Sequence, residues 1–425
     1  AARLLRSGSA LGGVNAAEIL LGFVAGAYRD VTGNPSLPLE VEGHGREDTL
    51  GNLDVTGTMG WFTSIYPAAI DTDEDVIRQI HHARRGLRGV PDKGLSYGAL
   101  KYLSDRLPGG MPAGMTYNYL GEVGEAGGNG LLRAVPGAKG EPISPRNALG
   151  SAVSVTVTVS AGALNLSFAY DPGMIDGGIA EHWMDRIKAR LVAAGDVAEI
   201  LKALQLAESV SPESGPEAAR PLETGGQNFG WPEVSEVDLN AIRARIPEGD
   251  IEAIYPMTPV QAGMVQIGLF SEEAYYHEQS MTVMEREIDP EDLRARLVKV
   301  TKRYEILRTA LLLEGLESPY CVVTRSAAPD YTHIALKDLP DDALSRYFPG
   351  LLTADRLQRF DYQKAPLLRV KTFALKEGKT ALLLSFPHAL LDGWSMNNIL
   401  EALFDPKPGR PMPPSNTVYA RWFAS

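Results

Sequence analysis

Cysteine is almost absent from this sequence of 425 residues, which contains only Cys321. A single cysteine cannot form an intramolecular disulfide framework, and it cannot supply the thiolate cluster of a structural zinc site. Because Cys321 lies in the apolar run 320–323, we expect a buried strand residue and not a nucleophile. The scarcity of cysteine favours a reducing compartment, and we expect the protein in the cytoplasm.

Long apolar runs and an excess of positive charge are also missing. No apolar segment reaches the roughly 18 residues of a membrane span, and the N-terminus lacks the layout of a signal peptide. Lys and Arg total 41 against 53 Asp and Glu, which gives a net charge of −12 without a basic stripe. This balance argues against a nucleic-acid partner. The first residue is not Met, so we expect a stretch of a larger protein.

The chain reads as two structured parts separated by a linker. In the first part, apolar residues alternate with polar ones from Val153 to Tyr170, which predicts a β-hairpin, and 179–204 reads as one or two helices. Between 208 and 230 the sequence fills with Pro, Gly, Ser and Glu without apolar periodicity, as in a linker.

The second part begins near Ile251 and again mixes helices with strands. Apolar spacing predicts a helix over 290–304 and another over 395–404. Residues 367–375 and 380–386 bracket a short turn, which predicts a hairpin. The second of these strands is apolar without alternation, so we place it in the centre of a sheet. The fold class that follows is α/β (α+β).

A histidine motif follows the predicted central strand. Residues 387–395 read Pro-His-Ala-Leu-Leu-Asp-Gly-Trp-Ser, which resembles the His-His-x-x-x-Asp-Gly motif of the condensation-domain superfamily. His388 matches the second His, to which that family's catalysis is assigned, and Asp392 and Gly393 match its structural pair. Pro387 stands where the family has its first, mainly architectural His.

Two further segments strengthen this resemblance. Residues 255–264 (Tyr-Pro-Met-Thr-Pro-Val-Gln-Ala-Gly-Met) resemble the family's opening motif, and 303–309 (Arg-Tyr-Glu-Ile-Leu-Arg-Thr) resemble its second. They occur in the family's order and at its distances. For Arg303, Glu305 and Arg308 we expect structural roles.

The first part resembles the sister epimerization family. Residues 42–47 (Glu-Gly-His-Gly-Arg-Glu) carry that family's complete signature, and 59–67 follow at the expected distance. Residues 91–98 resemble a third motif with Ser96 in place of Gly, and 117–121 resemble a fourth with Tyr117 in place of Phe. Four ordered motifs indicate the C-terminal half of an epimerization domain.

The resemblance implies a chemistry for the first part. Epimerization removes a proton from the α-carbon of a carrier-bound aminoacyl thioester and returns one, and Glu42 would be one of the two groups involved. A carboxylate of reference pKa about 4.3 is a weak base, so this role needs a buried cleft. Arg46, Asn118 and Tyr119 would line the same cleft and stabilise the enolate oxygen, whereas His44 would be structural.

The resemblance also implies an architecture. We expect residues 1–207 to be the C-terminal lobe of an epimerization domain, 208–250 an interdomain linker, and 251–425 the N-terminal lobe of a condensation domain. Each lobe would be chloramphenicol-acetyltransferase-like and half of a V-shaped domain. No cofactor or metal would be bound directly, since substrates arrive on the phosphopantetheine of carrier domains. The partners would be carrier and other domains of one nonribosomal peptide synthetase.

The expected function is epimerization of a carrier-bound thioester, followed by peptide bond formation. Residues 390–395 (Leu-Leu-Asp-Gly-Trp-Ser) resemble the condensation subtype that accepts D-configured donors. The isolated chain should be inactive, because each site lacks its second lobe. Two alternatives stay open: a stand-alone acyltransferase using acyl coenzyme A, and a non-catalytic fragment between modules. The order of lobes disfavours the first.

Overall fold

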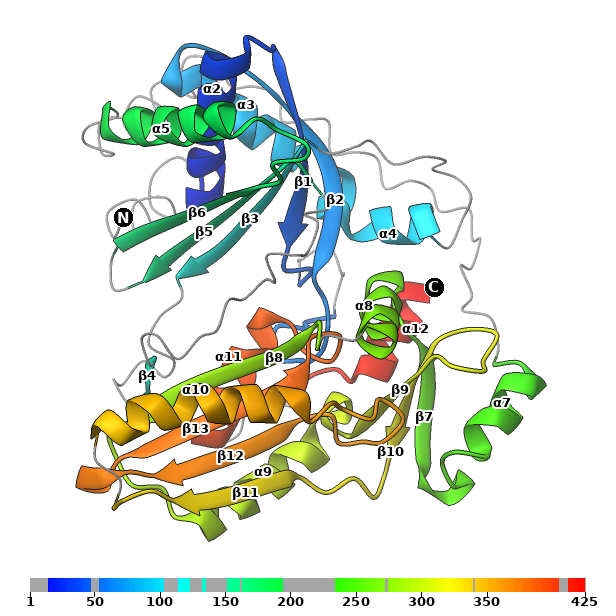
Figure 1. Cartoon of the computed structure of the whole chain (residues 1–425). Coiled ribbons are helices and arrows are strands. Elements are labelled where there is room, and N and C mark those ends of the chain that lie inside the picture. The colour runs from blue at the N-terminus through cyan, green and yellow to red at the C-terminus, as the bar shows by residue number, and fades with distance from the viewer. Residues whose placement is uncertain are drawn as a thin grey trace. The chain divides into compact units, whose positions relative to one another are not determined.

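The computed structural model describes residues 14–46, 53–102, 114–122, 132–134, 151–160, 163–193, 234–271, 274–338, 341–404 and 412–424. The chain divides into two compact units (Figure 1). The first comprises Ala1–Thr49, Thr63–Gly124 and Ser144–Gly225, and the second Leu50–Phe62, Glu125–Ile143 and Gly226–Ser425. Residues 50–62 precede most of the first unit in sequence but group with the second.

A five-stranded sheet of order β2-β1-β3-β5-β6 forms the first unit. Its strands are β1 (Ser36–Gly43), β2 (Ser64–Asp71), β3 (Met115–Glu122), β5 (Val153–Ser160) and β6 (Ala163–Tyr170). Strands β1, β3 and β5 are parallel neighbours, while β1–β2 and β5–β6 pair antiparallel. The hairpin predicted from Val153 to Tyr170 is thus confirmed.

Helices cover one face of this sheet. They are α2 (Ala16–Thr32), α3 (Val76–Arg88) and α5 (Gly177–Ala193), and the short α4 (Leu95–Tyr102) lies beside β2. Strand alternation turns Leu37, Leu39 and Val41 of β1 into the core beneath the helices, whereas Glu40 and Glu42 lie on the other face. The polar face of the sheet is therefore the one that can carry chemistry.

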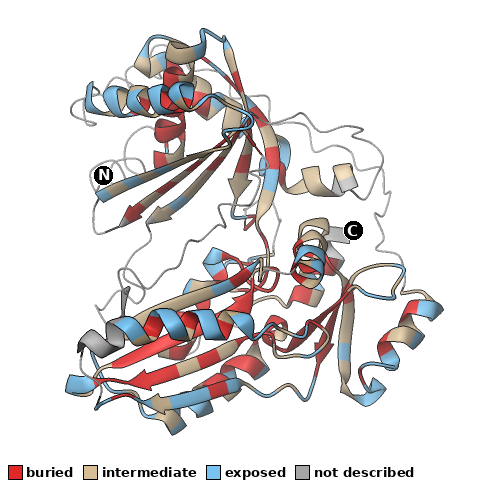
Figure 2. Cartoon of the chain, viewed as in Figure 1, coloured by how far each residue is buried: buried red, intermediate tan, exposed pale blue. Residues whose placement is uncertain are grey.

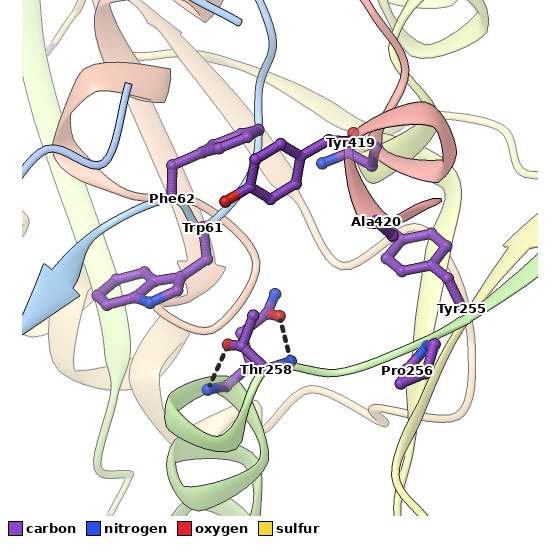
Figure 3. A pocket seen from close by; sticks show the side chains of 9 residues that line it. Trp61, Phe62, Tyr255, Pro256, Thr258, Tyr419 and Ala420 are labelled. Carbon is purple, nitrogen blue, oxygen red and sulfur yellow. Dashed lines mark hydrogen bonds between the residues drawn. The ribbon is translucent and has the colours of Figure 1, made fainter. Parts of the chain in front are cut away.

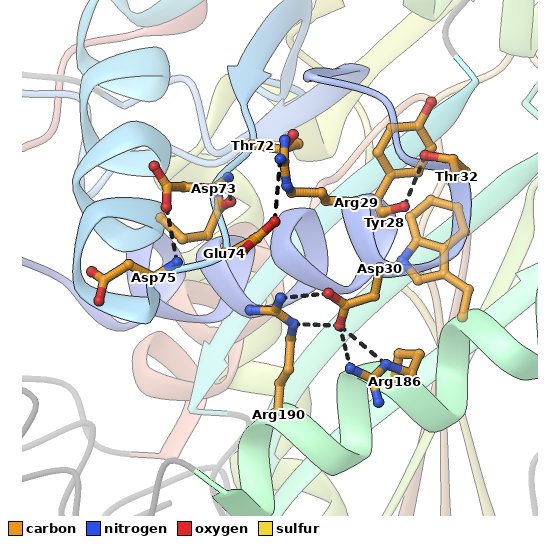
Figure 4. Close-up of polar contacts among 12 residues, drawn as sticks. Tyr28, Arg29, Asp30, Thr32, Thr72, Asp73, Glu74, Asp75, Arg186 and Arg190 are labelled. Atoms are coloured by element: carbon orange, nitrogen blue, oxygen red, sulfur yellow. Dashed lines mark hydrogen bonds and ion pairs between the residues drawn. The ribbon is translucent and has the colours of Figure 1, made fainter.

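A carboxylate on α2 joins α2 to α5. Asp30 accepts hydrogen bonds from Arg190 Nε at 2.7 Å and Nη2 at 2.6 Å, and from Arg186 Nη2 at 2.8 Å (Figure 4). Arg190 and Arg186 oppose the desolvation of Asp30 and hold the pKa of this carboxyl below its ordinary value. Beside this cluster, Trp183 Nε1 donates to the Val24 carbonyl at 3.2 Å.

The second unit is built on a sheet of order β11-β12-β13-β8-β4. Its strands are β4 (Leu132–Ala134), β8 (His277–Met284), β11 (Asp330–Ala335), β12 (Arg369–Ala374) and β13 (Thr380–Pro387). Helices α9 (Pro290–Arg303) and α11 (Gly393–Phe404) pack on one face, and α10 (Asp341–Leu357) packs on the other. Strand β13 is central and buried at every residue (Figure 2), which confirms the prediction from its unbroken apolar run.

A smaller sheet of order β7-β10-β9 completes the second unit. It comprises β7 (Ile251–Pro256), β9 (Thr309–Leu312) and β10 (Tyr320–Thr324), and it is accompanied by α8 (Pro259–Phe270) and α12 (Asn416–Ala424). Cys321 is fully buried in β10, as predicted. Burial raises the pKa of its thiol to about 12, which disables it as a nucleophile near neutral pH.

The linker differs from its predicted extent. Residues 208–233 lie outside the described ranges, but 234–250 form α7 (Glu236–Arg243) and a 3₁₀ turn (Glu248–Asp250). Ile242 and Ile246 are buried against apolar residues of β9 and β10. The structured part of the second unit therefore begins before residue 251. Two isoleucines in an otherwise polar stretch pack into its core, and sequence periodicity did not reveal them.

Both units combine sheets with helices, so the predicted α/β fold class is confirmed. Among the helices within the described ranges, none is long and apolar enough to cross a membrane.

Candidate functional site

His388 lies immediately after β13 and is held by its backbone and its ring. Its N–H donates to the Tyr276 carbonyl at 2.7 Å, and its Nδ1 lies 3.1 Å from the Leu391 carbonyl oxygen. A carbonyl oxygen can only accept, so this contact places the ring proton on Nδ1. In the neutral ring, Nε2 then carries the lone pair that can accept a proton from a substrate.

Trp61 packs against the His388 ring. The two ring centroids are 4.8 Å apart and the ring planes meet at 88°, an edge-to-face contact. Trp61 comes from residues 53–62, the segment that the structure groups with the second unit. The imidazole is thus held on one side by aromatic packing as well as by hydrogen bonds.

Asp392 organises the turn between His388 and α11. Its Oδ1 accepts from the Ser395 N–H at 2.9 Å and the Ser395 hydroxyl at 2.8 Å, which is the geometry of a helix N-cap. Its Oδ2 accepts from the Phe62 N–H at 3.1 Å, and its own N–H donates to the Gly60 carbonyl at 3.2 Å. Asp392 is 3% exposed, so its contacts are structural, and Gly393 is the first residue of α11.

Other contacts fasten residues 53–62 to the second unit. The Thr56 carbonyl accepts from Trp394 Nε1 at 2.9 Å and from Asn398 Nδ2 at 3.0 Å. Gly60 has φ +154°, and a Cβ there would overlap the Asn416 amide, so this position requires glycine.

A small aromatic pocket adjoins this segment (Figure 3). It is lined by Trp61, Phe62, Tyr255, Pro256, Thr258, Gln261, Asn416, Tyr419 and Ala420. Thr258 and Gln261 form a capping box at the start of α8, and Gln261 Nε2 also donates to the Ala389 carbonyl at 3.0 Å. The segment 255–264 therefore supports the turn that follows His388.

Arg308 is the last residue of a 3₁₀ turn (Glu305–Arg308) that directly precedes β9. Its Nη1 and Nη2 form a bidentate pair with Glu252 at 2.6 and 3.0 Å, and Nη1 also donates to the Thr324 carbonyl at 2.8 Å. Hydrogen bonding from Arg308 holds the pKa of Glu252 below its ordinary value. The structural role expected for Arg308 stays a prediction.

Glu42 occupies the polar face of the first unit's sheet. In the strand register it is the partner of Ile65 on β2 and of Asn118 on β3. Asn118 is paired with Thr156 on β5, and Thr156 with Ser167 on β6. Register partners share a face about 4.8 Å apart, so Glu42 and Asn118 are immediate neighbours in a row that crosses all five strands.

The chain turns directly after Glu42. Gly45 has φ +64°, and the Arg46 N–H donates to His44 Nδ1 at 3.0 Å. Arg46 Nη1 also reaches the His44 carbonyl at 3.4 Å, and Arg46 is 5% exposed. The expected structural role of His44 agrees with this turn, which buries Arg46 four residues after Glu42.

Tyr119 lies on the opposite face of the sheet from Glu42. It is adjacent to Asn118 in β3, its register partner is the buried Val157, and it packs against the core under the helices. Strand alternation sends neighbouring side chains to opposite faces. The structure therefore brings Asn118 to Glu42 but not Tyr119, in contrast to the cleft location expected from the motif.

Several residues near His388 and Asp392 were not predicted as site residues. Gln261 carried a signal, since Thr258-x-x-Gln261 is the spacing of a capping box. Tyr276 and Ser395 carried none, because their contacts depend on strand pairing and on the helix cap. Within the part of the chain that the structure describes, no group of His, Cys, Asp and Glu could hold a metal ion.

Comparison with known proteins shows which families this chain resembles. A family model described as the condensation domain matches residues 251–425. Bacitracin synthase 3 of Bacillus licheniformis is 29% identical over 394 residues, which cover 91% of this chain and 6% of that protein. Bacitracin synthase 1 of the same organism is 27% identical over 407 residues, covering 95% of this chain and 7% of that protein.

A solved structure is also similar to part of this chain. The epimerization domain from the third module of tyrocidine synthetase B is 26% identical, with a TM-score of 0.40, covering 46% of this chain and 44% of that one. Residues 251–425 are thus similar to the condensation-domain family. The chain as a whole is similar to nonribosomal peptide synthetases, which confirms the resemblance drawn from the motifs, and it spans at most 7% of the length of the two synthetases named above.

Proposed function

We propose that this chain spans the junction between an epimerization domain and a condensation domain of a nonribosomal peptide synthetase, here called the parent synthetase. The observation that carries the proposal is the His388 turn, which combines a family motif with a ring whose Nε2 is available as an acceptor. Supporting it, the similarity to synthetases runs through both units in one alignment. A stand-alone acyltransferase would not account for the order of the motifs, in which those of the epimerization type precede those of the condensation type.

In the first unit, Glu42 would transfer the α-proton of a carrier-bound aminoacyl thioester. Removal of this proton leaves an enolate, whose oxygen needs donors. The Asn118 amide, beside Glu42 in the register, can supply one. Return of a proton to the opposite face gives the D-configured residue. The second proton-transfer group would come from outside this chain.

In the second unit, His388 would orient the acceptor amine. The amine nitrogen bonds to the donor carbonyl carbon, the carbon–sulfur bond breaks, and the amine proton passes to the departing thiol. An α-amine of pKa about 8 is roughly one-tenth neutral at pH 7, a deficit of about 1.4 kcal/mol. Since this deficit is small, the larger gain comes from holding the amine near the thioester, and Nε2 can accept its N–H for that purpose.

The substrates would arrive on phosphopantetheine arms of carrier domains, in the cytoplasm. The donor would be D-configured, because an epimerization half precedes the condensation half and residues 390–395 resemble the D-accepting subtype.

Two substitutions in the parent synthetase test the assignment. Glu42→Gln keeps the shape but cannot accept the proton, so deuterium wash-in at the α-carbon should stop while aminoacyl loading continues. Glu40→Gln, on the same face of β1, is the matched control and should exchange normally. Near-normal exchange in Glu42→Gln would remove Glu42 from the reaction.

His388→Ala should reduce dipeptide formation to a small residual rate and leave upstream epimerization intact. His333→Ala, an exposed histidine on β11, is the control. Donor selectivity is measured in the Glu42→Gln background with matched L- and D-aminoacyl groups on the upstream carrier. Equal or faster use of the L-donor would contradict the stereochemical part of the proposal.

A further inference from the structure

The backbone of His388 is held by Tyr276, the residue directly before strand β8. In the antiparallel pairing of β8 with β13, Pro387 is the partner of His277. Pro387 has no N–H to donate. Directly after β13, the His388 N–H bonds to the carbonyl of Tyr276, directly before β8, at 2.7 Å.

Tyr276 adopts an uncommon conformation. Its φ is +56°, in the left-handed region that side chains other than glycine rarely occupy. Such a conformation persists only where the surrounding contacts hold it. Relaxation of φ would turn the Tyr276 carbonyl away from the His388 N–H, so whatever fixes Tyr276 also fixes His388.

His277, the next residue, is anchored in the interior. It is 8% exposed, and its ring lies against Phe360 with centroids 5.1 Å apart. Its Nε2 faces the carboxylate of Asp355, 3.6 Å from Oδ2. Among the described residues, this nitrogen has no closer hydrogen-bonding partner. The Asp355 carboxylate is therefore the nearest polar partner of His277 Nε2.

Asp355 gathers contacts from three strands. This buried carboxylate on α10 accepts from Lys371 Nζ of β12 and from the Ser385 hydroxyl of β13, both at 2.6 Å. It also accepts from Gln279 Nε2 of β8 at 3.0 Å and Arg369 Nη1 of β12 at 3.1 Å. Burial alone would raise the pKa of Asp355, but contacts with His277, Lys371, Ser385 and Gln279 outweigh it and hold the pKa far below its ordinary value. Asp355 is thus a fixed anion.

We propose that His277 and Asp355 form a positioning pair that holds Tyr276 in its left-handed conformation and thereby sets the location of His388. Ser385 ties Asp355 to β13 two residues before Pro387, and His277 ties it to β8 opposite Pro387. One carboxylate therefore contacts both β8, which begins beside His388, and β13, which ends there. This inference rests on the proposed role of His388 in condensation.

The test uses the parent synthetase with carrier-bound donor and acceptor. His277→Ala should lower kcat for dipeptide formation by about tenfold or more, with KM for the donor carrier changed by less than about twofold, because the amine is misplaced but carrier docking is not. Upstream α-proton exchange should not change. His333→Ala, on the edge strand of the same sheet, is the matched control.

Two substitutions of Tyr276 separate an effect on the position of His388 from an effect on folding stability. Tyr276 is 38% exposed, so its replacement leaves no cavity in the core. Tyr276→Gly accepts a positive φ and should keep kcat within about threefold. Tyr276→Val disfavours it strongly and should lower kcat as His277→Ala does. Equal activity of the Gly and Val variants would overturn the inference even if His277→Ala fails to fold.

A double substitution completes the test. If His277 acts through His388, adding His277→Ala to His388→Ala should not lower the residual rate further. A further loss would show that His277 acts elsewhere. The proposed function fails separately, if His388→Ala condenses at the parent rate. If His388→Ala is inactive while His277→Ala keeps its kcat, only the positioning inference fails.

Discussion

Replacement of Asp392 by alanine should destabilise the second unit strongly, although Asp392 lies in a turn outside the strands. The carboxylate caps α11 through the Ser395 N–H and bonds the Phe62 N–H across 330 positions of sequence. Loss of an N-cap costs about 1 kcal/mol. A buried N–H left without its acceptor costs about 2 kcal/mol more, and Phe62 is 4% exposed. The expected loss in the free energy of unfolding is about 3 kcal/mol.

Asn is the matched replacement for Asp392, because its amide oxygen can still accept one of these bonds. Asp392→Asn should therefore cost about 1 kcal/mol, a difference of about 2 kcal/mol from Ala. Asp176→Ala is the control, since Asp176 caps α5 of the first unit at an exposed position, through the Gly178 N–H at 2.9 Å. It should cost no more than about 1 kcal/mol.

Urea unfolding of the chain, followed by tryptophan fluorescence, measures these values. Trp61 and Trp394 lie beside the Asp392 turn, whereas Trp183 reports on the first unit. If Ala and Asn at position 392 unfold within about 0.5 kcal/mol of each other and of the parent, the carboxylate does not hold Phe62 and α11 as described.

Three further outcomes are expected. Asp30→Asn should cost about 2 kcal/mol near pH 7, because Arg190 and Arg186 lose their carboxylate. Since the pKa of Asp30 is lowered on folding, this stabilisation is present above the unfolded value of about 3.9 and lost as pH falls through the folded value, so parent and variant should converge in acid unfolding curves. Cys321 should resist a thiol reagent at pH 8 until urea unfolds the chain, and rapid labelling of the native protein would contradict its burial. The isolated chain should neither epimerize nor condense a carrier-bound aminoacyl thioester, and turnover comparable to that of the parent synthetase would refute the half-domain proposal.

Local patterns in the sequence determined much of the architecture. Alternation from Val153 to Tyr170 specified the hairpin of β5 and β6, and the unbroken apolar run of β13 specified a strand buried on both faces. The apolar spacing over 290–304 specified α9. These features follow from chemistry within one turn or one strand, which a sequence displays directly. The motifs around Glu42 and His388 are equally local, and they identified the family.

Only the tertiary structure decided which distant residues meet. Strand register set Asn118 beside Glu42, and alternation turned Tyr119 to the opposite face against the core, although Asn118 and Tyr119 belong to one motif. Pairing of β8 with β13 brought His277 and Tyr276 to the end of β13, and no pattern around Asp355 indicated that three strands would converge on it. Such contacts join residues far apart along the chain, so their partners are set by how sheets and helices pack, and neither periodicity nor composition records that choice.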